Sequence, residues 1–400
     1  MGIKRHFLLF IVSSLFLNAC SFKRIRFIPA TAEPVESKFE TYSELIFIEV
    51  EVNGVGGTFL FDNGFTESGI NASFAKRAHV TFKGKTSTRD ANNRSASTPT
   101  AVVDLVEIEG QKFVNAGFYR IDTDRFFPCK KIDGVIGASI INMANWKINF
   151  EAKNMWISSK TFEGKGIPLD ISFSNNNSSF TTISVLGQPY SCKIDLGNAN
   201  TVKLDPKYAE KSLEGIVAEK RIGIMSLSAH GLGNVDSTYQ IKELLEIQHR
   251  GKTLPVKEKV LFRGKLKYQG YLGINYFKPY DLIINSTEKR YWLSKRTKIP
   301  NPKSDSSYGV VLYPLEDKWK VIQLNSKDSL IKGIKLMDEV SIVDSIPMGQ
   351  FKGICEYKEF LRAKMKNKEV LKLTLKDGNH AYTIPLHQIE SQKLTIRKTD

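Results

Sequence analysis

Two aspartates, Asp62 and Asp195, are the residues whose type and spacing are best suited to chemistry. They lie 133 residues apart in two stretches that align without a gap. In each stretch an apolar run ends at the acid, and a glycine follows two residues later. Such an acid lies at the edge of a core, and the glycine permits a tight turn whose N–H reaches the carboxylate. The turn residues that support the two acids are Asn63, Gly64, Leu196 and Gly197.

The chemistry depends on whether these two acids meet in the folded chain. If the two stretches fold alike and pack about a twofold axis, their carboxylates come within a few ångström of each other and share one proton. One acid then takes a proton from water while the other gives a proton to a carbonyl oxygen, which is hydrolysis without a covalent intermediate. The alternative is that each aspartate is a turn residue that hydrogen-bonds its own backbone.

A second repeated pattern supports two copies of one structural unit. Gly134-Val135-Ile136-Gly137 recurs 136 residues later as Gly270-Tyr271-Leu272-Gly273, and an Asn, a Lys, a Trp and a Ser follow both in register. Two such matches in the same order indicate that residues 40–160 and 165–298 are copies of one lobe. Short β-branched and aromatic runs alternate with Gly, Asn and Ser turns across both copies, which predicts a mostly-β fold.

This order of motifs resembles the retropepsin/pepsin-like aspartic protease family in its two-lobed, single-chain form. The family's signatures are an Asp-Thr/Ser-Gly turn and a later apolar-apolar-Gly element, and both occur in each copy. The resemblance covers about residues 40–298 and implies two acid-protease β-barrels. It also implies an aspartic-type endopeptidase with Asp62 and Asp195 as the catalytic dyad, a water between them, and no cofactor or metal.

The resemblance also implies two flap hairpins that fold over the substrate. In the first lobe the flap is expected near residues 92–100, with Asn92 and Asn93 in it. In the second lobe it is expected near residues 230–234, where Gly231 and Gly233 indicate a mobile loop.

The chain departs from the family pattern beside both acids. The hydroxyl residue that follows each Asp in the family hydrogen-bonds across the lobes, but here these positions hold Asn63 and Leu196. Asn63 can partly replace the hydroxyl and Leu196 cannot, and Phe65 stands where a small residue is usual. A catalytically inactive lipoprotein that binds peptides or proteins therefore stays open as the alternative function.

The segment after the second copy is different in kind. Residues 299–307 read as a linker, and residues 308–390 resemble a PDZ domain through a Ser…Gly…Asp run and a later amphipathic helix. The resemblance implies a peptide-binding loop at Tyr308, Gly309, Val310 and Val311, where a peptide or partner adds as a strand. The alternative is a spacer without a ligand.

The N-terminus has the pattern of an export signal. Lys4 and Arg5 precede an apolar run over residues 7–17 that ends at Leu17-Asn18-Ala19-Cys20. This resembles the bacterial lipobox and implies a signal peptide over residues 1–19, lipidation of Cys20 and a tether over residues 20–39. We therefore expect an exported lipoprotein, held on the periplasmic face or in the outer membrane of a bacterium. A plain signal peptide with a chance cysteine is the alternative.

Composition limits the partners. The formal net charge is +16, but Lys and Arg are scattered along all 400 residues, which favours a solvated basic surface over nucleic-acid binding. We expect a monomer whose partners are a peptide or protein substrate and an anionic membrane surface. After lipidation three cysteines remain, so at least one thiol is free or pairs between chains. A Cys129–Cys192 disulfide is one possibility.

Overall fold

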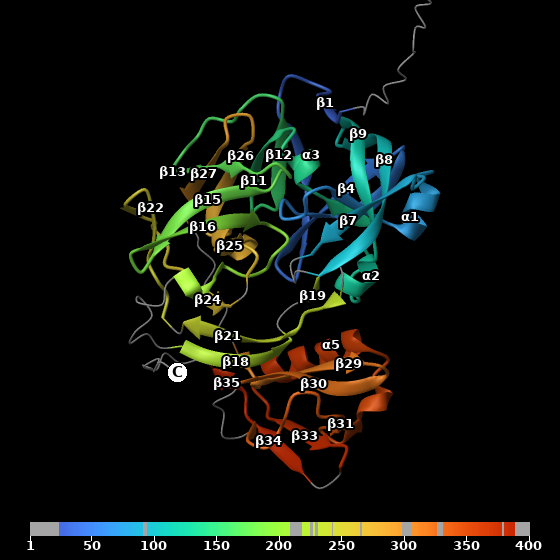
Figure 1. The fold of residues 1–400 in the computed structure, drawn as a ribbon, viewed down its shortest axis with the longest axis vertical. Helices are drawn as coiled ribbons and strands as arrows, with labels where there is room; N and C mark the ends of the chain where they lie inside the picture. Colours follow the sequence, from blue (N-terminus) through green and yellow to red (C-terminus); the bar gives the residue numbers. More distant parts are fainter. Residues whose placement is uncertain are drawn as a thin grey trace, which may run out of the picture.

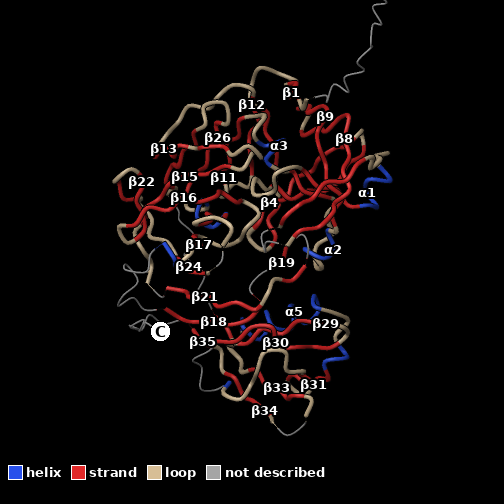
Figure 2. The backbone as a smooth tube through the Cα atoms, viewed as in Figure 1, coloured by secondary structure: helices blue, strands red, loops and turns tan. Residues whose placement is uncertain are grey.

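The fold consists of two β-rich lobes side by side and a smaller α+β domain beneath them (Figure 1). The tube view shows that strands make up most of the chain, which confirms the predicted mostly-β fold (Figure 2). The computed structural model describes residues 24–90, 94–208, 218–224, 227–228, 231–241, 243–264, 266–297, 306–325, 331–377 and 380–388.

The first lobe is built from one sheet that closes on itself. Pairing of β9 with β8 joins the ends of the path β9-β6-β10-β5-β4-β8 into a barrel. The strands are β1 (Arg26–Ile28), β3 (Glu40–Tyr42), β4 (Leu45–Val52), β5 (Val55–Phe61), β6 (Ser68–Asn71), β7 (Gly84–Arg89), β8 (Ser95–Ile108), β9 (Gln111–Ile121) and β10 (Gly134–Ile136). Three short helices accompany them: α1 (Ala72–Arg77), α2 (Thr123–Phe126) and α3 (Ala138–Ile141). The Asn71 side chain caps α1 by accepting from the Phe74 N–H.

The second lobe repeats the central pairing of the first. In the first lobe β10 is parallel to β5 and antiparallel to β6, and in the second β25 is parallel to β16 and antiparallel to β17. Its strands are β14 (Ser172–Phe173), β15 (Ser179–Val185), β16 (Gln188–Asp195), β17 (Val202–Leu204), β18 (Ala218–Ile224), β19 (Leu227–Ser228), β20 (Gly231–Leu232), β21 (Val235–Ile241), β22 (Ile247–His249), β23 (Lys252–Thr253), β24 (Val260–Arg263) and β25 (Gly270–Gly273). The 3₁₀-helix η1 (Pro206–Tyr208) and α4 (Ile274–Phe277) complete the described part.

A third sheet contains strands of both lobes and so joins them. Its order is β13 (Ile167–Asp170), β27 (Arg290–Lys295), β26 (Tyr280–Asn285), β11 (Asn145–Asn149), β12 (Asn154–Ser158) and β2 (Val35–Lys38). The strands β11 and β26 follow the two repeated glycine motifs and pair antiparallel, with Trp146 opposite Ile284. Apolar side chains of both lobes form one continuous core around this sheet. The lobes are therefore held in a fixed relation by backbone hydrogen bonds and by burial.

Part of the segment expected to be a tether is structured. The strand β1 pairs with β9, and β2 pairs with β12 at the edge of the joining sheet. Residues 1–23, including Lys4, Arg5 and Cys20, lie outside the described residues. Within the described part, no helix is long and apolar enough to cross a membrane.

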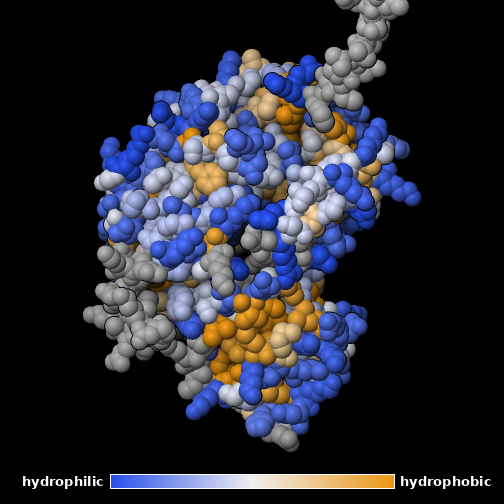
Figure 3. Space-filling view, viewed as in Figure 1, coloured by the Kyte–Doolittle hydropathy of each residue, from blue (hydrophilic) through white to orange (hydrophobic). Residues whose placement is uncertain are grey.

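The C-terminal domain has a core of its own, in which Trp319, Tyr357 and Leu373 are buried. Its elements are β28 (Ser306–Ser307), β29 (Val310–Leu315), β30 (Lys318–Asn325), β31 (Val340–Val343), β32 (Ile346–Pro347), η4 (Met348–Gln350), α5 (Ile354–Lys366), β33 (Leu371–Leu375), β34 (Ala381–Ile384) and β35 (His387–Gln388). Strand β28 lies within the segment expected to be a linker and pairs with β35. In the space-filling view a broad apolar area lies over this domain (Figure 3).

The C-terminal domain is joined to the second lobe by a continuous sheet. The strand β30 pairs antiparallel with β18, which makes β18 and β21 the boundary between the two bodies (Figure 1). Two side-chain bonds reinforce this pairing. The Gln323 amide donates to the Ile224 carbonyl at 2.7 Å, and the Asn325 amide donates to Glu219 at 2.9 Å.

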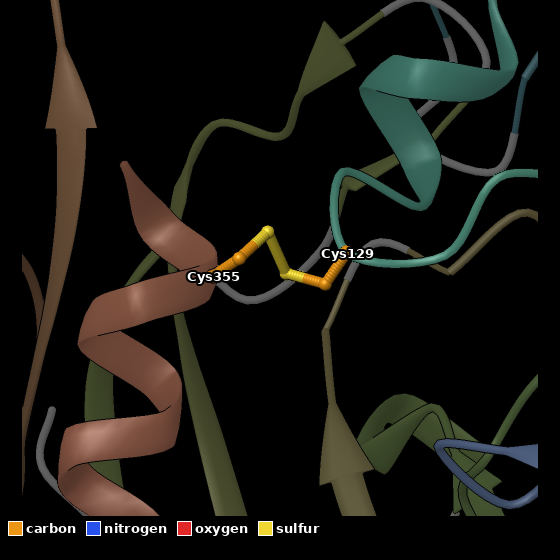
Figure 4. Close-up of a disulfide and its surroundings, with 2 residues drawn as sticks. All are labelled: Cys129 and Cys355. Atoms are coloured by element: carbon orange, nitrogen blue, oxygen red, sulfur yellow. A yellow bond between two sulfur atoms is a disulfide. The ribbon is translucent and has the colours of Figure 1, made fainter. Parts of the chain in front are cut away.

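A disulfide joins the same domain to the first lobe. It links Cys129, which follows α2, to Cys355 near the start of α5, across 226 residues of sequence (Figure 4). The Cys129–Cys192 pairing considered from the sequence is therefore wrong. Cys192 is a free thiol whose side chain is fully buried in the core of the second lobe, whereas Cys129 faces the C-terminal domain.

Removing this disulfide should weaken the attachment of the C-terminal domain. Because the crosslink closes a very long loop, the Cys129→Ser/Cys355→Ser variant should lose about 3–5 kcal/mol of unfolding free energy. Urea unfolding of the oxidised wild type and of the double variant measures this loss. Reductant should lower the stability of the wild type and leave the variant unchanged. Equal stability of oxidised and reduced wild type would contradict the prediction.

Candidate active site

The two aspartates end equivalent strands and meet where the lobes face each other. Asp62 follows the last residue of β5, and its N–H donates to the Ile136 carbonyl of β10 at 3.0 Å. Asp195 is the last residue of β16 and is paired with Gly273 of β25. The repeated glycine motifs therefore lie beside the two acids, as β10 and β25, and fix the backbone on which each carboxyl is carried.

Both turns bind the Asp62 carboxyl group. The Gly64 N–H donates to Asp62 Oδ1 at 2.7 Å from the same turn. The Gly197 N–H donates to the same oxygen at 3.1 Å from the other lobe. One carboxylate oxygen is thus shared between the backbones of the two lobes, which requires that the turns approach closely.

The two glycines show how close this approach is. A Cβ atom placed on Gly64 would lie 2.1 Å from Asp195 Oδ1, and one placed on Gly197 would lie 2.2 Å from Asp62 Cγ. Each carboxyl group therefore packs against the backbone of the opposite turn. A residue larger than glycine at position 64 or 197 would occupy the space that the carboxyl group fills. The structure brings Asp62, Asp195 and their four turn residues into one site.

Asn63 makes the cross-lobe bond that was expected of a hydroxyl. Its side chain is fully buried, and its Oδ1 accepts from the Leu196 N–H at 2.9 Å. Leu196 is also fully buried but has no polar side-chain atom, so it returns no such bond.

Lys193 is a further residue of the site, which the sequence reasoning missed. It lies two residues before Asp195 on β16, so both side chains are on one face of the strand. Its side chain is buried, and its Nζ donates to the Gly64 carbonyl in the other lobe at 2.7 Å. The available signal was a lysine between Cys192 and Ile194, in a strand that is otherwise apolar at this point.

Two more residues lie in one row with Lys193 across the sheet. Tyr271 of β25 is the register partner of Lys193 on one side and of Lys203 of β17 on the other. The wall beside Asp195 therefore carries two cationic side chains with a tyrosine between them.

Burial dominates the electrostatics of the pair. It raises the pKa of Asp62 to about 7, and the Asp195 charge adds to the rise, while the Gly64 N–H, the Lys193 charge and the Gly197 N–H oppose it. Burial also raises the pKa of Asp195, against the charges of Lys193 and Lys203 and a hydrogen bond with Asp62. Two like charges in such a place cannot both form easily, so the pair holds one proton well above the ordinary range of a carboxyl group.

One hairpin from each lobe extends to meet the other. The β7–β8 hairpin of the first lobe and the β18–β21 hairpin of the second, with β19 and β20 at its end, meet where Arg94 donates to Asn234 at 3.3 Å. Gly231 lies in β20, with a positive φ of 107°, close to the guanidinium groups of Arg94 and Arg125. Gly233 lies between β20 and β21, and Asn92 and Asn93 lie outside the described residues.

The residues expected to bind a peptide in the C-terminal domain have different surroundings. The Tyr308 side chain is 2% exposed, and its hydroxyl donates to the Glu369 carbonyl at 2.8 Å, so it belongs to the core. Gly309 adopts a positive φ of 69°, and its carbonyl accepts from the Asn325 N–H. Val310 points inward, while Val311 on β29 is 41% exposed. Of the four, Val311 is the side chain most open to a partner.

Comparison with known proteins bears on the first lobe. A sequence model of the aspartyl protease family matches residues 48–140, from within β4 to within α3, and so includes Asp62 and the first glycine motif. No curated protein matches the chain. The similarity of this segment to aspartyl proteases supports a peptidase-like function at a coarse level.

The glycines of the two turns can be tested by adding one methyl group. Gly197→Ala places Cβ against the Asp62 carboxyl, so the turns must separate, and we expect a loss of about 1–3 kcal/mol in unfolding free energy. Gly56→Ala is the control, because a Cβ there meets nothing within 4 Å. Urea unfolding compares both with the wild type. A Gly197→Ala variant as stable as Gly56→Ala would refute the close packing.

The raised pKa of Asp62 predicts how stability depends on pH. Between the ordinary aspartate pKa of 3.8 and about 7 the folded chain holds a proton that the unfolded chain has released, so stability should fall as the pH rises through this window. Asp62→Asn cannot ionise and should flatten this fall. Asp104→Asn, at an exposed position of β8, should keep the wild-type slope. Unfolding free energies from pH 3.5 to 8 give the slopes, and equal slopes for all three proteins would contradict the shift.

Proposed function

We propose that the chain is an aspartic-type endopeptidase, which hydrolyses peptide bonds with a water activated by Asp62 and Asp195. The observation that carries the proposal is the hydrogen bond from the Gly197 N–H to Asp62 across the lobes, which brings two partly buried carboxyl groups together. The similarity of the first lobe to aspartyl proteases agrees with it.

The mechanism follows from a pair that shares one proton. The ionised carboxylate takes a proton from the water while the water oxygen forms a bond to the carbonyl carbon. The protonated carboxyl gives its proton to the carbonyl oxygen, which yields a tetrahedral diol. The C–N bond then breaks as the carboxyl that took the water proton gives it to the amine nitrogen, and the other carboxylate takes back one diol proton, which restores the starting state of the pair. The partly buried position of the pair limits the access of bulk water to these transfers.

The surroundings of the pair have supporting roles in this proposal. The hairpins that meet at Arg94 and Asn234 open to admit a peptide and close over it. The C-terminal domain binds peptide or a partner chain as a strand beside β29, which is the last strand of its sheet among the described residues and exposes Val311. The β18–β30 pairing would hold such a ligand near the second hairpin.

The proposal includes a membrane anchor. The first described strand, β1, begins at Arg26, only a few residues after Cys20, so a lipid on Cys20 would hold the first lobe close to the membrane of a bacterium. The net charge of +16 suits an anionic lipid surface. The chain would act there as a monomer.

One observation favours a different function. Leu196 supplies no hydroxyl to the opposite turn, and a slightly displaced pair can be catalytically silent. In that case the site at the acid pair and the C-terminal domain would bind peptides or proteins without cutting them.

Peptide cleavage by the mature chain decides between the two. We would incubate the protein beginning after Cys20 with a diverse peptide mixture from pH 3 to 8, beside Asp62→Asn, Asp195→Asn and the control Asp104→Asn. Hydrolysis should fall by roughly 10²–10⁴-fold in either dyad variant and stay unchanged in the control. Absence of cleavage at every pH, from folded wild-type protein, would overturn the endopeptidase and favour the binding function.

A further inference from the structure

Lys193 is a buried cation whose direct partner is a neutral backbone atom of the other lobe. Its side chain is 7% exposed, and its Nζ donates to the Gly64 carbonyl at 2.7 Å. Lysine is almost never buried to this degree unless it is paired, because its charge loses the hydration of water. The two acids supply the compensating charge, since Lys193 is one of the groups that act on both Asp62 and Asp195.

The hydrogen bond from Lys193 lies where the two turns lack a cross-lobe bond from Leu196. Asn63 of the first lobe accepts from the Leu196 backbone of the second, and Leu196 returns nothing from its side chain. In the Lys193 bond the side chain comes from the second lobe instead, and it donates to the backbone of the turn that carries Asp62. The two bonds together link the Asp62 turn to the Asp195 side of the site, through one side chain from each lobe.

We propose that Lys193 is a positioning residue, which clamps the Asp62 turn in place of the hydroxyl missing at Leu196 and keeps one carboxylate of the pair ionised. This inference rests on the proposed endopeptidase function and names the residue that lets its altered turns work. The groups that face Lys193 are Asp62, Asp195, Tyr268, Tyr271 and Lys203.

Lys203 offers a matched comparison. It lies in the same row, one strand further from Asp195, and its charge acts on Asp195. Burial and Arg263 lower its pKa to about 8. Within the described residues it makes no hydrogen bond to the first lobe. Lys203→Met therefore removes a nearby positive charge but no hydrogen bond between the lobes. Lys193→Met removes both a nearby positive charge and the hydrogen bond to the Gly64 carbonyl.

The experiment compares these two variants with the wild type in kcat and KM across pH. Lys193→Met should lose at least tenfold in kcat at its optimum, with KM changed less than threefold, because the acids and not the substrate contacts are displaced. Its acidic limb should move to higher pH, since a positive charge beside both acids is gone. Lys203→Met should move the limb in the same direction without the tenfold fall. Lys252→Met, at an exposed position of β23, should change neither quantity.

A rescue separates the clamp from the charge. Leu196→Thr restores a hydroxyl beside Asp195, so Lys193→Met/Leu196→Thr should regain most of the lost kcat while its acidic limb stays shifted. Lys193→Gln is the second variant if Lys193→Met does not fold, because it keeps an N–H donor without the charge. Its kcat should stay close to that of the wild type, while its acidic limb should move to higher pH. Wild-type kcat and pH profile in Lys193→Met, or in Lys193→Gln if that variant replaces it, would overturn the inference. Equal losses in Lys193→Met and Lys203→Met, or no rescue, would overturn the clamp.

A second measurement keeps the inference testable if the wild type cleaves nothing. In that case the endopeptidase proposal fails, and the pH dependence of unfolding still reports the pair. The fall in stability that Asp62 causes should extend to higher pH in Lys193→Met than in the wild type, because the loss of the cation raises the pKa of both acids further. An unchanged window in folded Lys193→Met would contradict the role of Lys193 directly.

Discussion

Two partly buried carboxyl groups that lie close together are the constraint on which the rest of this structure depends. Burial alone disfavours their charge, and each disfavours the charge of the other, so the pair retains a proton to about pH 7. Such an arrangement lowers the free energy of unfolding at any pH at which both acids would ionise in the unfolded chain. It persists because the Gly64 and Gly197 N–H groups donate to Asp62 and the nearby Lys193 charge acts on both acids, which together compensate the remaining charge.

The architecture supplies the rigidity that this pair requires. Each acid stands at the end of a strand whose neighbour is the repeated glycine motif, and the joining sheet sets the two copies in antiparallel register. The C-terminal domain adds a second connection between the lobes that does not pass through the acids. It continues the sheet of the second lobe at β18 and is linked by the disulfide at Cys129 to the first. The turns are therefore held by local bonds and by two larger frameworks around them.

The parts of this arrangement that the sequence predicted are those that repeat. The matching acids and glycine motifs predicted two similar units and the meeting of Asp62 and Asp195, and the short β-branched runs predicted the mostly-β fold. The sequence indicated that Asn63 could partly replace the missing hydroxyl, and in the structure its side-chain oxygen accepts a cross-lobe hydrogen bond.

What the sequence did not predict depends on contacts between distant segments. The role of Lys193 depends on its hydrogen bond to the Gly64 carbonyl, 129 residues away in the sequence. Cys129 forms its disulfide with Cys355, 226 residues away, while the buried Cys192 stays a free thiol. The pairing of β30 with β18 and the incorporation of β1 and β2 into sheets also depend on where strand edges come to lie, which no local pattern records.

The most direct test of this account counts the protons on the acid pair. Carbon-13 NMR of protein labelled at the aspartate carboxyl carbons would follow both acids from pH 3 to 9, with Asp62→Asn and Asp195→Asn spectra assigning the two signals. We expect the two signals to titrate together, with one proton retained by the pair up to about pH 7. Two independent titrations near the ordinary aspartate pKa of about 3.9 would contradict a shared proton, because the carboxyl groups would then be neither adjacent nor shielded from water.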